Sequence, residues 1–154
     1  MRPLDLSLAP PRSPYDELDG LVFMPRTIDK LRSMLPGGDP GEFFINGPIK
    51  GMSGYLLERL GVSEADLLAV VAGASDDDEV AAWLRTHADA GRYAEISATI
   101  RAIKPKHSVD PTVFGEIYAE TLALHPELER ILDIIEADDR RLFPETKGRL
   151  PAFP

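Results

Sequence analysis

The clearest alternation of hydrophobic and polar positions lies in residues 21–35. A short apolar run leads into Pro25, and apolar residues then recur at the spacing of one helix face, at Ile28, Leu31, Met34 and Leu35. The other side of the same turns carries four charged residues, Arg26, Asp29, Lys30 and Arg32. The pattern predicts an amphipathic helix that Thr27 caps and that ends before the turn at residues 36–38.

Residues 49–104 contain no proline, and helix start signals recur through them. Serine is favoured as an N-cap because its side chain accepts a hydrogen bond from a free N–H group of the first turn. An aspartate three residues later resembles the second half of a capping box. Three successive short helices are therefore predicted, with Ser53, Ser63 and Ser75 as their N-caps and with glycines at their ends, Gly61, Gly73 and Gly91.

The third of these helices begins with three consecutive acids, at residues 76–78. Carboxylates in a first turn are stabilised by the positive end of the helix dipole, whereas adjacent helical positions point in different directions. The triplet is therefore interpreted as a helix start and not as a metal site. Further along, the apolar spacing places Trp83 and His87 in the core, His87 as a buried histidine.

Two or three further helices are predicted in the second half of the chain. A stripe from Tyr93 to Ile103 has helical spacing and ends at Pro105. Asp110 followed by proline is typical of an N-cap and a first helical position, and the helix that it opens carries an apolar face as far as Leu122. A histidine–proline pair at residues 125–126 interrupts it. Apolar spacing over residues 128–135 indicates a last helix, either separate or continuing after a kink.

Proline and glycine are concentrated outside the predicted helices. Residues 1–20 are expected to form an extended proline-rich arm packed on the domain, although the prolines at 10–14 would also suit a polyproline II ligand for a partner. Residues 36–51 form a long Gly/Pro-rich loop, and residues 142–154 an irregular tail. The best strand candidate, residues 42–45, is short. Residues 1–154 are thus predicted to be one compact all-α domain of six or seven short helices.

Composition narrows the classes of function. The chain has 154 residues, no cysteine and a net charge of −9, which argues against general nucleic-acid binding because phosphate attraction needs clustered Lys and Arg. No apolar run approaches the roughly 18 residues of a membrane span, and the N-terminus lacks the pattern of a secretory signal. We therefore expect a soluble cytoplasmic protein that binds neither nucleic acid nor membrane.

The charged side of the first helix is the candidate site. Arg26 and Lys30 are four residues apart and share a helix face, and Asp29 and Arg32 lie on an adjoining face. Two cations near a helix N-terminus suit a carboxylate or a phosphate, so the four residues are predicted to form an anion site. The alternative is structural: Arg26 and Lys30 would bond to acids of the arm, at residues 16, 17 and 19, and hold the arm in place.

A pocket is expected next to this helix if the long loop folds over it, lined by Tyr15, Phe43, Phe44 and Tyr55. No nucleophile signature and no phosphate loop occurs, and the three histidines lack the spacing of metal ligands. No catalytic residue, cofactor or metal is therefore assigned.

Two hypotheses for function remain open. The first is a non-enzymatic binding or interaction module that recognises a protein partner or an anionic small molecule. The second is a small enzyme acting on an anionic metabolite, with Arg26 and Lys30 as a substrate clamp and with Asp29 or His107 moving a proton.

Four blocks of residues resemble a known family. They are residues 11–14 (PRSP), residues 20–30 (GLVFMPRTIDK) with Arg32, residues 53–62, and residues 75–83 (SDDDEVAAW); residues 134–141 are a weaker match. Together they are similar to small bacterial proteins catalogued as domain of unknown function 5069. The resemblance implies a helical cytosolic domain, and it implies no activity, substrate or cofactor.

Overall fold

Residues 1–144, which this computed structural model describes, form eight α-helices and one short hairpin, with brief 3-10 turns at Ala90–Arg92 and Pro105–His107. The helices are α1 (Met24–Ser33), α2 (Met52–Leu60), α3 (Glu64–Gly73), α4 (Asp77–His87), α5 (Tyr93–Ala102), α6 (Pro111–Ile117), α7 (Ala119–Leu124) and α8 (Ile131–Leu142); the strands are β1 (Glu17–Leu18) and β2 (Leu21–Val22). The predicted all-α class is confirmed. The count exceeds six or seven because the helix expected after Asp110 divides at Tyr118 into α6 and α7.

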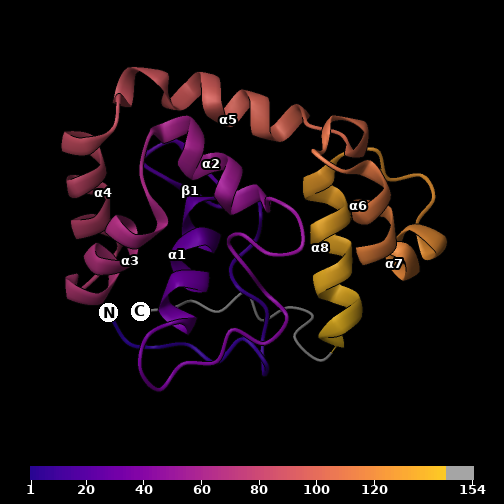
Figure 1. The fold of residues 1–154 in the computed structure, drawn as a ribbon, viewed down its shortest axis with the longest axis horizontal. Helices are drawn as coiled ribbons and strands as arrows, with labels where there is room; N and C mark the ends of the chain where they lie inside the picture. Colours follow the sequence, from indigo (N-terminus) through magenta and orange to yellow (C-terminus); the bar gives the residue numbers. More distant parts are fainter. Residues whose placement is uncertain (145–154) are drawn as a thin grey trace.

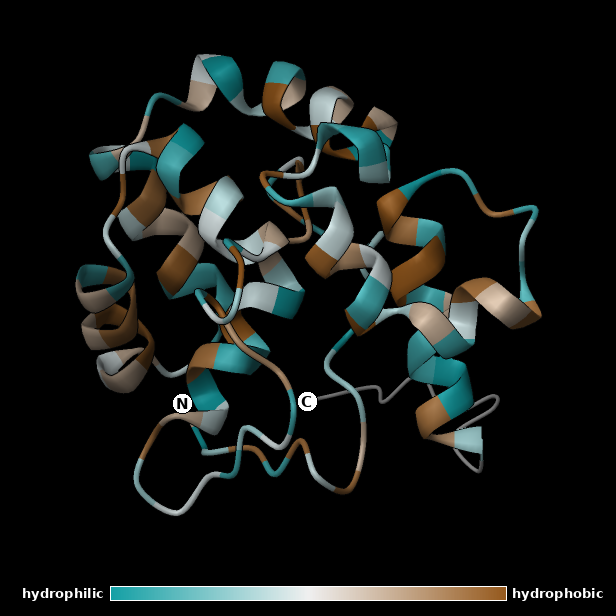
Figure 2. Ribbon diagram, turned by 45° about the vertical axis from the view of Figure 1, so that its right-hand side comes forward, coloured by the Kyte–Doolittle hydropathy of each residue, from teal (hydrophilic) through white to brown (hydrophobic). Residues whose placement is uncertain are grey.

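Helix α1 lies at the centre of the fold, with α3 and α4 on one side, α6, α7 and α8 on the other, and α5 running across the top (Figure 1). Hydrophilic and hydrophobic segments alternate along most of the helices (Figure 2). In α1, however, nine of the ten residues are buried. The charged side of α1, which the sequence pattern placed opposite the core, is therefore inside the molecule as well.

The start of α1 differs from the prediction. The helix begins at Met24, after Phe23 with a positive φ of 72°, and Pro25 lies in its first turn, where a missing N–H costs nothing. Thr27 is therefore not the N-cap. Its hydroxyl donates to the Phe23 carbonyl oxygen at 3.0 Å and forms a second hydrogen bond, as the acceptor, with the Ser53 hydroxyl at 3.1 Å. Ser53 is likewise not a cap, since Gly51 precedes α2; the buried hydroxyl pair instead links α1 to α2.

The arm ends in the hairpin, which no sequence pattern predicted. Glu17 pairs with Val22 and Leu18 with Leu21, and the two turn residues, Asp19 and Gly20, both have positive φ. Two positive φ values are typical of the type I′ turn, whose twist suits a tight hairpin. Residues 42–45, the predicted strand candidate, form no strand.

The rest of the arm packs on the domain, as expected. The backbone N–H groups of Leu4 and Leu6 donate to the carbonyl oxygens of Arg32 (3.3 Å) and Asp39 (2.7 Å), and Leu6 is buried. Pro11 and Pro14, two of the prolines that suit a polyproline II ligand, are buried as well. The arm is thus held by the domain along its length.

Several helix ends follow the predicted cap chemistry. The Ser63 hydroxyl accepts from the Asp66 N–H at 3.0 Å, and the Asp110 carboxylate accepts from the first turn of α6. Gly61 ends α2 in the left-handed conformation that glycine favours. For α4 the cap is Asp76 and not Ser75, one residue later than predicted.

In the second half of the chain one prediction is wrong, and one alternative that the sequence left open is decided. His87 is exposed: its ring stacks on Trp83 with centroids 4.0 Å apart, because α4 turns Val80 and Leu84 toward the core and leaves this face at the surface. Helix α8 starts at Ile131, after a turn that contains Leu128, so it is a separate element and not a kinked continuation.

Most of the tail predicted over residues 142–154 lies outside the described residues; Leu142 itself is the last residue of α8. No helix in residues 1–144 is long and apolar enough to cross a membrane.

Ser97 on α5 fastens the hairpin. Its buried hydroxyl donates to the Gly20 carbonyl oxygen at 2.6 Å and accepts from the Val22 N–H at 3.0 Å. Replacing it in Ser97→Ala leaves both backbone groups without a partner, so we expect the free energy of unfolding to fall by about 1–3 kcal/mol in urea denaturation. Thr99→Ala, on the exposed side of the same helix, is the control and should change it by less than about 0.5 kcal/mol. Equal effects would contradict this role.

Candidate functional site

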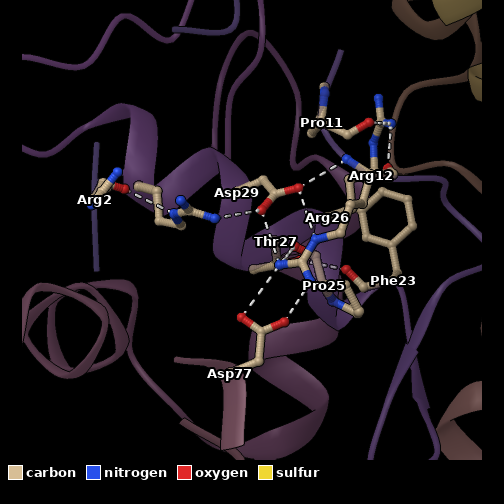
Figure 3. Close-up of polar contacts among 10 residues, drawn as sticks. Arg2, Pro11, Arg12, Phe23, Pro25, Arg26, Thr27, Asp29 and Asp77 are labelled. Carbon is tan, nitrogen blue, oxygen red and sulfur yellow. Dashed lines mark hydrogen bonds and ion pairs between the residues drawn. The ribbon is translucent and has the colours of Figure 1, made fainter. Parts of the chain in front are cut away.

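Arg12 ties the arm to α1 and α4 through two aspartates (Figure 3). Its backbone N–H and its Nε donate to Asp29 Oδ2 at 2.9 and 3.0 Å, and its Nη2 donates to Asp29 Oδ1 at 2.9 Å. The remaining guanidinium hydrogens reach Asp77 in the first turn of α4 and the Pro25 carbonyl oxygen. Burial alone would lower the pKa of Arg12. The hydrogen bonds that Arg12 donates to Asp77 and Asp29 have a larger combined effect with the charges of these carboxylates, so the pKa is raised above its ordinary value.

We call the contacts of Arg12 with Asp29 and Asp77 the arm clamp, and Asp29 and Arg32 both belong to it. Asp29 is fully buried, and the Arg32 Nη1 lies 3.6 Å from its Oδ1 while the Arg32 Nε donates to the Arg2 carbonyl oxygen at 2.9 Å. The sequence prediction grouped both residues with Arg26 and Lys30. The structure separates the four into two pairs on different sides of α1.

The arm acids do not bind Arg26 or Lys30, contrary to the structural alternative. Glu17 pairs with Arg101, and Asp19 pairs with Arg85 at 2.6 Å, both at the surface. An ion pair does hold the arm on α1, but the charges are exchanged relative to the prediction: the arm supplies the cation, Arg12, and the helix supplies the carboxylate, Asp29.

Arg26 is almost completely enclosed, with 2% of its surface exposed. Its Nη1 and Nη2 donate to the two carboxylate oxygens of Asp139 on α8, at 2.6 and 2.9 Å, and Nη1 also donates to the Arg12 carbonyl oxygen at 3.0 Å. The guanidinium carbon lies 5.8 and 5.4 Å from the ring centres of Phe23 and Phe43. Its buried Nε–H has no acceptor in residues 1–144.

Lys30, one turn further along α1, is 8% exposed and has no ion-pair partner in the described part of the chain. Its Nζ donates to the Phe44 carbonyl oxygen at 3.0 Å and lies 5.4 and 5.9 Å from the rings of Phe23 and Phe44. Burial, with a smaller contribution from the neighbouring charge of Arg26, lowers the pKa of Lys30 to about 7, although the charge of Asp139 acts in the opposite direction. Burial also raises the pKa of Asp139, against the opposite effect of Arg26.

Arg26 and Lys30 line a cavity of about 130 Å³ between α1, α8 and the long loop. Its other walls include Phe43, Phe44 and Tyr118, whose pKa burial raises to about 12, so that its hydroxyl stays protonated at neutral pH. A more apolar chamber of about 70 Å³ adjoins it. The two spaces share six wall residues: Phe44, Gly51, Met52, Ile117, Tyr118 and Ile135.

Three of the four predicted pocket residues line these two spaces. Phe43 and Phe44 line the cavity, and Phe44 and Tyr55 line the chamber. Tyr15 lines neither, because its hydroxyl is bonded to Asp133 at the start of α8. Sequence reasoning missed Asp139 and Tyr118. Both lie about 90 or more residues after α1, and no spacing rule links them to it.

His107, proposed as a proton carrier, lines the chamber and not the cavity, and its Nδ1 accepts from the Lys104 N–H at 3.1 Å. Within residues 1–144, no group of three or more histidine, aspartate or glutamate side chains is arranged to hold a metal ion.

The fold and the cavity define a class of protein: a helical domain whose central helix carries two buried cations beside an enclosed space. A family model described as domain of unknown function (DUF5069) matches residues 8–141, and the chain belongs to that family. The match includes the arm clamp, α1 and Asp139. A search of curated proteins finds no match.

The arm clamp predicts a large loss of stability on removal of its buried carboxylate. We expect Asp29→Ala to lower the free energy of unfolding by about 3 kcal/mol, because it leaves Arg12 without its buried counter-charge. The matched control is Glu17→Ala, which removes a surface ion pair and should cost less than about 1 kcal/mol. Similar losses in the two variants, measured by urea denaturation, would show that the clamp adds no more than a surface pair.

The lowered pKa of Lys30 predicts a specific pH dependence of stability. Between pH 7 and 10.5 the unfolded chain binds one proton more than the folded chain, so the free energy of unfolding contributed by Lys30 rises with pH across that window. The slope reaches at most about 1.4 kcal/mol per pH unit. Subtracting the Lys30→Met variant from the wild type, in urea denaturation between about pH 6 and 9.5, isolates this effect because other groups cancel. A flat difference would contradict it.

Proposed function

We propose that the protein binds a small organic anion in the cavity between α1 and α8. Two side chains on one wall carry the proposal: Lys30 has no carboxylate partner in the described residues, and Arg26, although paired with Asp139, keeps a buried Nε–H without an acceptor there. A buried donor without an acceptor costs about 1–3 kcal/mol. Oxygen atoms of a bound carboxylate would satisfy both.

The charge balance of the cavity supports an anionic ligand. Its lining holds three cations and three acids, of which Arg26 pairs with Asp139 and Arg141 with Asp138. The third acid, Glu42, is exposed and solvated, whereas the third cation, Lys30, is buried. Inside the molecule the uncompensated charge is therefore that of Lys30 when it is protonated, and an anion would offset the cost of burying it.

Size and lining indicate which organic anions fit. The cavity and the chamber, of about 130 and 70 Å³, are well below the roughly 300–1,000 Å³ of pockets for drug-sized ligands. A nucleotide is too large. A short carboxylic acid would place its charge at Lys30 and its hydrocarbon part against the shared apolar walls, such as Met52 and Ile135.

Binding is favoured over the two alternatives. Asp29, one of the two groups considered as a base in an enzyme, is occupied by Arg12 on another side of α1. The proline-rich arm, considered as a ligand for a protein partner, is buried at Pro11 and Pro14 and would have to leave the domain to be recognised.

The test is a calorimetric titration of straight-chain carboxylates from acetate to hexanoate, with the matching alcohols as uncharged controls. We expect the acids alone to bind, about fourfold more tightly for each methylene until the chamber is full. Binding should be tighter at about pH 6 than at about pH 8.5, since Lys30 is protonated below its pKa of about 7.

Two variants complete the test. Lys30→Met keeps a similar volume and should abolish binding, while Lys106→Met, which removes an exposed lysine, should leave it unchanged. Alcohols that bind as well as acids, or full binding to Lys30→Met, would refute the proposal.

A further inference from the structure

The surroundings of Lys30 suit a nucleophilic amine as well as a binding group. An amine attacks a carbonyl carbon only when it is neutral and its lone pair is accessible. Within residues 1–144, the one hydrogen bond of Nζ runs to the Phe44 carbonyl oxygen. A carbonyl oxygen can only accept, so this bond uses an N–H group of Lys30. The lone pair of the neutral amine is therefore not engaged by this bond, and the Lys30 side chain lines the cavity.

No carboxylate of the described residues forms an ion pair with Lys30, and the more distant charge of Asp139 favours the ammonium form less than burial and Arg26 oppose it. Two aromatic rings exclude water, and the permanently charged guanidinium of Arg26 stands one helical turn away. These are the two conditions, an apolar pocket and a neighbouring cation, under which a lysine becomes a nucleophile. With its pKa lowered to about 7, Lys30 is about half neutral at pH 7, against roughly one in a few thousand for a surface lysine.

We propose that Lys30 condenses reversibly with the carbonyl carbon of a small oxo acid, the organic anion of the proposed function on which this inference rests. Nζ forms a bond to the carbonyl carbon, and the carbonyl oxygen takes up a proton to give a carbinolamine. That hydroxyl then leaves as water with a proton from nitrogen, and a C=N bond remains. Amine and carbonyl thus give imine and water, with no oxidant or reductant, and addition of water reverses the step.

The position of Arg26 favours an oxo acid over a neutral aldehyde as the compound that reacts with Lys30. The buried Nε–H of Arg26 has no acceptor in the part of the chain that the structure describes. Because residues four apart on a helix face the same side, a carboxylate held at Arg26 would bring the adjacent carbonyl carbon toward Lys30. The aromatic and aliphatic walls shared with the chamber would surround the remaining carbon atoms.

The experiment is reductive trapping on the full-length protein. Pyruvate is added with sodium cyanoborohydride, which reduces an imine to a stable secondary amine, and peptide mapping by mass spectrometry locates the adduct. We expect one adduct, at Lys30, with a yield that is half-maximal near pH 7 and not near the ordinary lysine pKa. Lys30→Met should lose the adduct and Lys106→Met should keep it. Because the mapping uses the wild-type protein, the result does not depend on how well the variant folds.

Each outcome decides a different point. Adducts on Met1 or on surface lysines, with none on Lys30, would overturn the imine. If the straight-chain acids nevertheless bind in the calorimetric titration, the binding proposal stands. If they do not bind, both proposals fail. Propanal, a neutral carbonyl compound, is the matched probe, and trapping at Lys30 with propanal as readily as with pyruvate would overturn the oxo-acid assignment. Trapping with pyruvate alone would support it.

Discussion

The structure depends on how the buried polar side of α1 is satisfied. A charge taken out of water costs several kcal/mol unless a partner compensates for it. Asp29 is compensated by Arg12 from the arm, which also reaches Asp77 on α4, and Arg26 is compensated by Asp139 on α8. The paired residues are 17, 65 and 113 positions apart along the chain, and they join the arm to α1 and α4, and α1 to α8. The positions of the arm, α4 and α8 therefore follow from the charges that α1 buries.

Lys30 is the buried charge of α1 for which the described residues supply no opposite charge. It receives one neutral hydrogen-bond acceptor, the Phe44 carbonyl oxygen, and two aromatic faces. Arg26, whose Nε–H has no acceptor in residues 1–144, lines the same cavity as Lys30. The two sides of one helix thus differ: Asp29, on the side facing the arm, is paired with Arg12, whereas Lys30, beside the cavity, has no opposite charge among the described residues.

Local sequence patterns predicted the helices better than they predicted what the helices bury. Cap chemistry and apolar spacing identify α3, α5 and α6, because these signals act within one or two turns. The spacing of Arg26 and Lys30 placed them on one face correctly. The burial of that face was not predictable, since an amphipathic pattern assigns charged residues to solvent. The predictions for Tyr15, His87 and Thr27 were wrong because the partners of these residues depend on tertiary packing and on where α1 begins.

The identity and the pairing of the two cations on α1 determine which of them loses its proton. In a medium of low dielectric constant, two like charges one helical turn apart repel each other strongly. An arginine does not deprotonate in proteins, and Arg26 is further held in its charged form by both oxygens of Asp139. Lys30 is the group that can respond, and burial and Arg26 together lower its pKa to about 7. Burial is the main cause of this lowered pKa, the charge of Arg26 adds to it and the charge of Asp139 opposes it, so that α8 affects the chemistry of Lys30 without bonding to it.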